Sequence, residues 1–362
     1  MKKILIVFNH QAPYKVRFFN ELTKYFDVTV IFERNYASDR DKKFYTEKNF
    51  LFKSIKIKGL NIGRENFISS GIVKFLKKNT FDLILMNGYS TFAEMRTIRY
   101  LKRNKIPYLL YINGGIINKT ESSLKRKIKT KYISGAKAYL SPDESSNSYL
   151  EYYGANKDKI FLYPYSTIYE NEIINNPVSL LEKQKDRNAN EKITFISAGQ
   201  FIERKNFFTI ISSWKNMPND YHLYIYGDGK LYEKNCKFVN DFQLNNVHLH
   251  RFLKRNELLE KIQKADIFIF PSKEDIYGHV VNEAMSQGVP VISNTNVNAA
   301  KKLITNNLNG YITNDFSADN ILKISKSLLQ DKIQQKCIET AKENTIEKMG
   351  KIFADNLMEL LK

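Results

Sequence analysis

The sequence predicts an α/β protein built from two doubly wound, Rossmann-like domains. Its 362 residues are too many for one ordinary core, which indicates two domains. In both halves, short and continuous apolar runs alternate with helical patterns. Such alternation is typical of parallel strands that are connected by helices and buried on both faces.

The first domain is expected to span residues 1–175. A helical pattern begins at Tyr14, after the first strand, and ends at Tyr25. The alternation of strands and helices breaks in a polar stretch at residues 170–190, so we expect an interdomain linker at residues 176–192. The predicted strands are residues 4–8, 28–32, 83–86, 108–112 and 138–141.

The second domain is expected to span residues 193–345. A helical pattern near the end of the chain runs from Asp319 to Lys362, with a break near Thr345. The part after this break, residues 346–362, is expected to form a separate C-terminal helix that packs back on the first domain. The predicted strands are residues 193–197, 221–226, 247–249, 267–270 and 291–293.

Positive charge is concentrated in the first half of the chain. The net charge is +19, and residues 1–180 contain 31 Lys and Arg against 16 Asp and Glu, a balance of +15. We therefore expect an anionic partner on this half, and nucleic acid or an anionic membrane face would both fit. Two cysteines support no disulfide framework, and no apolar run reaches the ~20 residues that span a bilayer. These features predict a cytoplasmic protein.

Residues 271–290 carry the strongest chemical signal. A predicted strand is followed by an acidic pair, Glu274 and Asp275, then by Gly278 and a helical pattern that contains Glu283. In an open α/β sheet such a loop lies beyond the carboxyl end of its strand, where ligands bind. Amides at a helix start can hold a phosphate, and carboxylates can hold hydroxyl groups.

This segment resembles the signature of the family-four retaining glycosyltransferases, the glycosyl transferases group 1 type, which have the GT-B fold. The shared pattern is Pro-Ser, an acid, a glycine three residues later, Glu-Ala-Met and Gly-x-Pro-Val-Ile. The two family glutamates, separated by seven residues, correspond to Asp275 and Glu283, and Gly278 favours Asp275 over Glu274. The resemblance implies two domains that face a central cleft, with a nucleotide-sugar donor on the second and an acceptor on the first.

The resemblance also implies donor contacts at several strand ends of the second domain. Gly199 and Lys205 match the family pattern, but Gln200 stands where the family has an arginine. Lys205, helped by Arg204, would then neutralise the diphosphate. Gly227 would allow a close approach of the backbone, the backbone of Phe252 and Leu253 would hold the base, and Glu283 would bind the ribose. The other implied donor contacts are Asp275, Tyr277, Gly278, His279 and Val280.

The first domain is expected to hold the acceptor, because its opening strand, loop and helix resemble the acceptor-side segment of the family. Asn113 stands where many family members place a histidine near the donor sugar. Its amide can hydrogen-bond a hydroxyl but cannot act as an acid or base. The candidate acceptor contacts are His10, Tyr14, Lys15 and Arg17. The expected catalytic residues are Asp275, Lys205 and Asn113.

A basic amphipathic pattern occupies residues 123–133. Leu124 and Ile128 are four residues apart, and cations surround them. This pattern suits an anionic lipid surface, and an ordinary solvated helix beside the core would also show it. The cations are Lys125, Arg126, Lys127, Lys129 and Lys131.

The resemblance implies a retaining, hexosyltransferase-type glycosyltransferase. We expect it to move a sugar from a nucleotide sugar, a UDP-sugar rather than a GDP-sugar, to a saccharide or lipid-linked saccharide in bacterial surface polysaccharide or glycoconjugate synthesis. We expect a peripheral protein on the inner membrane face, with no nucleic acid partner and no cofactor. No metal is expected, because the one Asp-x-Asp, Asp39–Asp41, lies away from the strand ends. Two alternatives stay open: a GT-B-fold nucleotide-sugar epimerase, against which Asn113 argues, and a non-enzymatic basic protein that binds membranes or nucleic acid.

Overall fold

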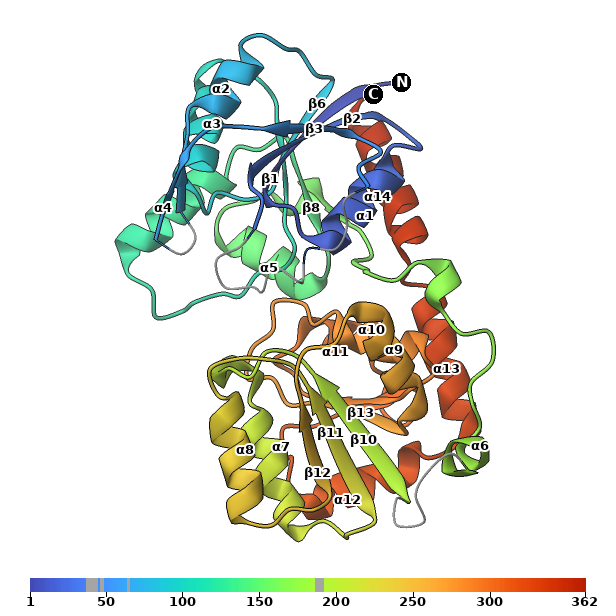
Figure 1. Ribbon diagram of the computed structural model, residues 1–362. Coiled ribbons are helices and arrows are strands. Elements are labelled where there is room, and N and C mark those ends of the chain that lie inside the picture. Colours follow the sequence, from blue (N-terminus) through green and yellow to red (C-terminus); the bar gives the residue numbers. More distant parts are fainter. Residues whose placement is uncertain (37–44, 46–48, 64–65, 186–191) are drawn as a thin grey trace. The chain divides into compact units, whose positions relative to one another are not determined.

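The computed structural model describes residues 1–362 apart from 37–44, 46–48, 64–65 and 186–191. The chain forms two compact units. Unit 1 consists of Met1–Thr167 and Ile346–Lys362, and unit 2 is Ile168–Thr345. The change from unit 1 to unit 2 therefore comes before the linker expected at residues 176–192. Each unit contains one large parallel sheet with helices around it (Figure 1).

The sheet of unit 1 has seven parallel strands in the order β3-β2-β1-β6-β7-β8-β9. This order reverses between β1 and β6, as in a doubly wound sheet. The five inner strands were predicted, whereas the edge strands β3 and β9 and a separate antiparallel pair, β4 and β5, were missed, because these strands are only three or four residues long and partly exposed. The strands are β1 (Lys3–His10), β2 (Asp27–Arg34), β3 (Lys53–Lys56), β4 (Leu60–Ile62), β5 (Asn66–Ile68), β6 (Leu83–Met86), β7 (Leu109–Tyr111), β8 (Ala138–Ser141) and β9 (Ile160–Leu162).

Residues that favour a helix start stand at the N-termini of two helices in unit 1. Pro13 is the first residue of α1, where a backbone N–H would have no helical partner. Thr91 and Glu94 form a reciprocal capping box at α3. The helices of this unit are α1 (Pro13–Leu22), α2 (Gly71–Leu76), α3 (Phe92–Arg103), α4 (Ser123–Ile133), α5 (Glu144–Tyr152), the short η2 (Lys157–Lys159) and α14 (Ile346–Leu360).

The last helix of the chain, α14, packs against α1, near the other end of the chain (Figure 1). The ring of Phe353 lies edge-on to that of Phe18, with centroids 5.1 Å apart. Gly350 permits this close approach, because a Cβ at this position would lie 2.5 Å from Cγ of Glu21. The C-terminal helix thereby completes the core of unit 1.

The sheet of unit 2 has six parallel strands in the order β12-β11-β10-β13-β14-β15. Its order reverses between β10 and β13, which marks the switch point of this sheet. The first five strands along the chain were predicted, and only the edge strand β15 was missed. The strands are β10 (Ile193–Ala198), β11 (Tyr221–Tyr226), β12 (Val247–His250), β13 (Ile267–Phe270), β14 (Val291–Ser293) and β15 (Gly310–Ile312).

Helices cover both faces of this sheet, with α7 and α8 on one side and α9 and α10 on the other (Figure 1). The segment expected as a linker contains helix α6, whose Lys183 is buried and donates to the carbonyl of Ala265 at 2.6 Å. This contact ties α6 to unit 2, and residues 186–191 lie outside the described residues. The helices are η3 (Glu170–Glu172), α6 (Leu180–Lys185), η4 (Glu203–Lys205), α7 (Phe207–Ser213), η5 (Trp214–Asn216), α8 (Tyr232–Asp241), α9 (Arg255–Lys264), α10 (Val280–Ser286), α11 (Asn298–Leu303), α12 (Ala318–Leu328) and α13 (Asp331–Lys342).

Candidate functional site

Two loops meet at the switch point of the unit 2 sheet. Residues 199–205 follow β10, and residues 271–278 follow β13. The N–H of Lys273 donates to the carbonyl of Arg204 at 2.8 Å, and the hydroxyl of Ser272 donates to the same carbonyl at 3.0 Å. These bonds hold the basic end of one loop beside the acidic part of the other.

Lys205 and Asp275 form an ion pair between these loops. The ammonium of Lys205 contacts Oδ2 of Asp275, and Nη1 of Arg204 lies 3.6 Å from the same oxygen. Both side chains of the pair are only 13% exposed. Burial alone would raise the pKa of Asp275, but the charges of Lys205 and Arg204 outweigh burial and hold that pKa below its usual value. Asp275 is therefore a carboxylate at neutral pH.

The two members of the acidic pair differ in their surroundings. Glu274 is exposed, and its backbone carbonyl accepts a hydrogen bond from Arg204 at 2.8 Å. Asp275 points toward Lys205 instead. The loop then turns at Gly278, which has a φ of 94°, and a Cβ there would lie 2.5 Å from a side-chain carbon of Val297. This geometry favours glycine and puts Asp275, not Glu274, in the site.

The loops that follow β10, β11 and β12 are joined at the same edge of the sheet. Gly227 has a φ of 156°, and a Cβ there would lie 1.8 Å from the carbonyl oxygen of Gly199. After β12, the N–H of Phe252 donates to Oδ2 of Asp228 at 3.1 Å. The structure thus brings the loops of Gly199, Gln200, Gly227, Phe252 and Leu253 to the strand ends that also carry the ion pair.

Glu283, on α10, is held by an arginine that sequence reasoning missed. Nε of Arg255 lies 3.5 Å from Oε1 of Glu283, and Nη1 of Arg255 lies 2.5 Å from Glu172. The side chain of Glu283 is largely buried. Arg255 begins α9, and only the packing of α9 beside α10 reveals the pairing.

The remaining predicted donor contacts lie around the start of α10. Tyr277 is buried, and its ring centroid is 5.0 Å from that of His279. His279 occupies the position before the helix, and Val280 is the first helical residue. Tyr277 therefore lies in the loop that carries Asp275, and His279 and Val280 directly follow that loop.

In unit 1, Lys15 is fully buried and holds Asn113. Its ammonium donates to Oδ1 of Asn113 and lies 4.4 Å from the ring centroid of Tyr165 and 5.3 Å from that of Tyr111. Burial lowers the pKa of Lys15 well below its usual value. Lys15 was expected to contact an acceptor, but α1 turns this side chain into the aromatic core, where it positions the amide of Asn113 instead.

The other acceptor candidates also make contacts within unit 1. His10 is buried, with Nδ1 lying 3.3 Å from the hydroxyl of Tyr45. Arg17 donates to the carbonyl of Thr167 at 3.0 Å. Tyr14 is partly buried. Among the four candidates, Tyr14 and Arg17 retain accessible surface.

A buried pair of acids in unit 1 was not predicted. Glu33, near the end of β2, and Glu94, in the first turn of α3, are both buried. The hydroxyl of Thr91 lies between them, donating to Glu33 at 2.7 Å and accepting from the N–H of Glu94 at 3.1 Å. Burial raises the pKa of both acids. The residues are far apart in sequence, so no local pattern announces the pair.

The basic segment of residues 123–133 forms helix α4. Its apolar residues Leu124 and Ile128 are 67% and 41% exposed. Lys129 is tied into the fold by an ion pair with Glu121 at 2.7 Å. The exposed cations of the helix are Lys125, Arg126, Lys127 and Lys131.

No group of three or more His, Cys, Asp or Glu side chains could hold a metal ion, as far as the described residues extend. The Asp39–Asp41 motif lies outside them. In the same described part of the chain, no helix combines the length and apolar character needed to cross a membrane.

Residues 180–344 match the model of a family described as Glycosyl transferases group 1. Over 307 residues, the chain is 27% identical to an uncharacterized 41.2 kDa protein in the cps region of Klebsiella pneumoniae, with 80% of each chain covered. It is 30% identical over 99 residues to the lipopolysaccharide core biosynthesis glycosyltransferase LpsE of Rhizobium meliloti, which covers 27% of this chain and 28% of LpsE. The structure of Anabaena Alr3699/HepE in complex with UDP is similar, with a TM-score of 0.77 at 14% identity over 99% of this chain and 100% of HepE. This likeness confirms the predicted α/β fold class.

Proposed function

We propose that this chain is a glycosyltransferase that transfers a sugar, with retention of configuration, from a nucleotide-sugar donor to a saccharide acceptor. The match of residues 180–344 to the Glycosyl transferases group 1 model and the likeness of the fold to that of HepE support this proposal. The observation that carries this proposal is the Lys205–Asp275 pair at the switch point of the unit 2 sheet. Both charges are largely buried beside loops that contain close-packed glycines, as a site for a diphosphate and a sugar requires.

The donor is proposed to be a UDP-sugar. HepE, which has a similar structure, was solved with UDP and with UDP-glucose. The largely buried carboxylate of Glu283 would accept hydrogen bonds from the ribose hydroxyls, with Arg255 fixing its orientation. The backbone of Phe252 and Leu253 would lie along the base.

During transfer, negative charge grows on the departing diphosphate. Lys205 and Arg204 would stabilise this charge without a metal ion, because both cations already converge on one point, Oδ2 of Asp275. Asp275 would hold hydroxyls of the donor sugar or lie beside its anomeric carbon. The bond from this carbon to the diphosphate breaks, and the acceptor hydroxyl forms the new bond on the same face, which positioning and electrostatics can support without a covalent intermediate.

The acceptor is proposed to be a saccharide carried on a lipid at the inner membrane face, in bacterial surface polysaccharide or glycoconjugate synthesis. Two relatives support this: LpsE is named for lipopolysaccharide core biosynthesis, and the Klebsiella protein lies in a cps region. Helix α4 also supports it, because exposed Leu124 and Ile128 stand among exposed cations. Apolar and basic side chains together suit an anionic lipid surface.

A panel of nucleotide sugars, tested by thermal unfolding, would identify the donor. A ligand at 100 times its dissociation constant stabilises the folded state by about 2.7 kcal/mol. The matching donor should then turn over only when a saccharide acceptor is added, and the product should keep the anomeric configuration of the donor by NMR. Conversion of the donor without an acceptor would support an epimerase instead, and an inverted product would contradict the retaining mechanism.

A further inference from the structure

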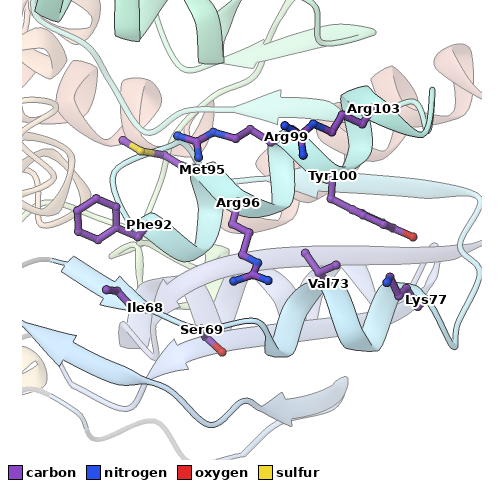
Figure 2. Close-up of a pocket in the computed structure, with 10 residues that line it drawn as sticks. All are labelled: Ile68, Ser69, Val73, Lys77, Phe92, Met95, Arg96, Arg99, Tyr100 and Arg103. Atoms are coloured by element: carbon purple, nitrogen blue, oxygen red, sulfur yellow. The ribbon is translucent and has the colours of Figure 1, made fainter.

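Helices α2 and α3 and strand β5 line a basic pocket in unit 1. Its volume is about 590 Å³. Figure 2 shows Arg96 extending from α3 toward α2, above Ser69 and beside Val73. The lining residues are Ile68, Ser69, Val73, Lys77, Phe92, Met95, Arg96, Arg99, Tyr100 and Arg103.

Four of these residues are cations, and none of the described residues that line the pocket is acidic. The side chains of Lys77, Arg96 and Arg103 make no hydrogen bond or ion pair with any described residue. Arg99 is oriented by a neutral partner, since its Nε donates to the hydroxyl of Tyr132 at 2.6 Å. Four like charges that share a pocket without a carboxylate repel one another, so an anion would bind there favourably.

The same pocket has an apolar part. Phe92 and Ile68 are 49% and 41% exposed, and Val73 and Met95 also line the pocket. An inorganic anion gains nothing from such side chains, whereas a molecule with both a phosphate and an acyl chain would cover them.

The pocket also joins the surface of α4. Arg99 reaches Tyr132 of α4, and the ammonium of Lys102 on α3 donates to the carbonyls of Lys131 and Ser134 at 2.6 and 2.5 Å. These bonds pack α3 against α4, so the pocket and the exposed cations of α4 belong to one basic region of unit 1.

We propose that this α2–α3 pocket is a binding site for the phosphate headgroup of an anionic membrane lipid. Guanidinium groups suit phosphate oxygens because their planar fork can donate two parallel hydrogen bonds. Arg96 and Arg103 hold the phosphate, while Phe92 and Ile68 contact the acyl region. The inference does not depend on glycosyl transfer, since nothing in it involves the donor loops.

The first test is binding of the full chain to phosphatidylcholine vesicles with and without phosphatidylglycerol. Arg96→Gln with Arg103→Gln should weaken binding to the anionic vesicles on the order of thirtyfold, from about fivefold per charge. The matched control is Lys157→Gln with Lys159→Gln, which removes two exposed charges from η2, outside the pocket. The control should bind nearly as the unaltered chain does, and an equal loss in both double variants would overturn the proposal.

The second test uses calorimetry with short-chain phosphatidylglycerol below its micelle concentration, compared with inorganic phosphate. The lipid should bind the unaltered chain and the α4 variant Lys125→Gln with Lys127→Gln, and should lose affinity in Phe92→Ala. Equal binding of inorganic phosphate, or lipid binding unaffected by Arg96→Gln with Arg103→Gln, would refute a lipid headgroup site. Thermal unfolding checks that each variant is folded, and donor binding measured in parallel reports separately on the proposed function.

Discussion

Lys205 and Asp275 lie seventy residues apart in sequence, yet their side chains form an ion pair at the carboxyl ends of β10 and β13. Lys205 is the charged group that acts most strongly on Asp275, and both side chains are largely buried. A diphosphate bound at this edge of the sheet would compete with Asp275 for the ammonium of Lys205. Donor binding would therefore weaken the ion pair between Lys205 and Asp275.

We predict that Lys205→Ala lowers the turnover rate about a hundredfold or more, because it removes the cation closest to the growing charge. Donor affinity should fall less than the turnover rate. Steady-state kinetics and donor titration measure the two effects separately. Lys273→Ala is a suitable control, since Lys273 is an exposed cation next to the same loops. If the turnover rate is unchanged and only the Michaelis constant for the donor rises, Lys205 stabilises the bound donor and the transition state equally, which would contradict the prediction.

We predict that Glu283→Ala weakens donor binding by about 1.5–3 kcal/mol, the contribution of hydrogen bonds to a charged group. The variant should stay folded, because Arg255 keeps its ion pair with Glu172 at 2.5 Å. Calorimetric titration with the donor measures the change. Glu274→Ala removes an exposed acid from the loop that precedes α10, and this variant should bind the donor normally. Unaltered affinity in a folded Glu283→Ala protein would exclude the ribose role.

We predict that transfer continues in the presence of EDTA. Lys205 and Arg204 already place positive charge where a metal ion would act. Initial rates with EDTA, and with added magnesium or manganese, test this directly. A complete loss of activity that either metal restores would mean that the enzyme depends on a metal ion.

We predict that Glu33→Gln raises the free energy of unfolding more at high pH than at low pH. The unfolded chain releases the Glu33 proton near the usual 4.5, whereas burial and the nearby Glu94 raise the pKa in the folded state. The folded protein therefore binds more protons above this pH, and its stability falls as pH rises. Glutamine does not titrate, so the variant should gain at least about 1 kcal/mol over the unaltered chain between about pH 5 and pH 8.

Urea unfolding at these two pH values measures the difference. Glu151→Gln, at an exposed acid on α5, should show no such pH-dependent gain. Parallel loss of stability in the unaltered chain and in Glu33→Gln would contradict a raised pKa for Glu33.

We predict that helix α4 docks on anionic membranes. Lys125→Gln with Lys127→Gln should weaken binding to anionic vesicles by about fivefold per charge, and added salt should weaken binding of the unaltered chain. Lys129 is left in place because its pair with Glu121 belongs to the fold. Donor affinity should not change. Equal binding to neutral and anionic vesicles would leave α4 as an ordinary solvated helix.

Much of the fold could be predicted because buried parallel strands are continuous apolar runs. Ten of the fifteen strands in the described part of the chain, including β1, β6, β10 and β13, were recognised in this way. The edge strands β3, β9 and β15 were missed, because strands that are partly exposed or short lack that signal. Helix α6 was taken as linker because its sequence is polar, but Lys183 ties it to unit 2 through Ala265.

The sequence by itself determined the strand-end loops of unit 2, including Asp275, Lys205 and Gly278, because spacing along the chain sets which residues follow a strand. Only the tertiary structure decided which side chains meet. It paired Lys205 with Asp275, joined Arg255 to Glu283, and turned Lys15 inward to Asn113. Such pairs depend on the packing of elements that are distant in sequence, and no local pattern along the chain records that packing.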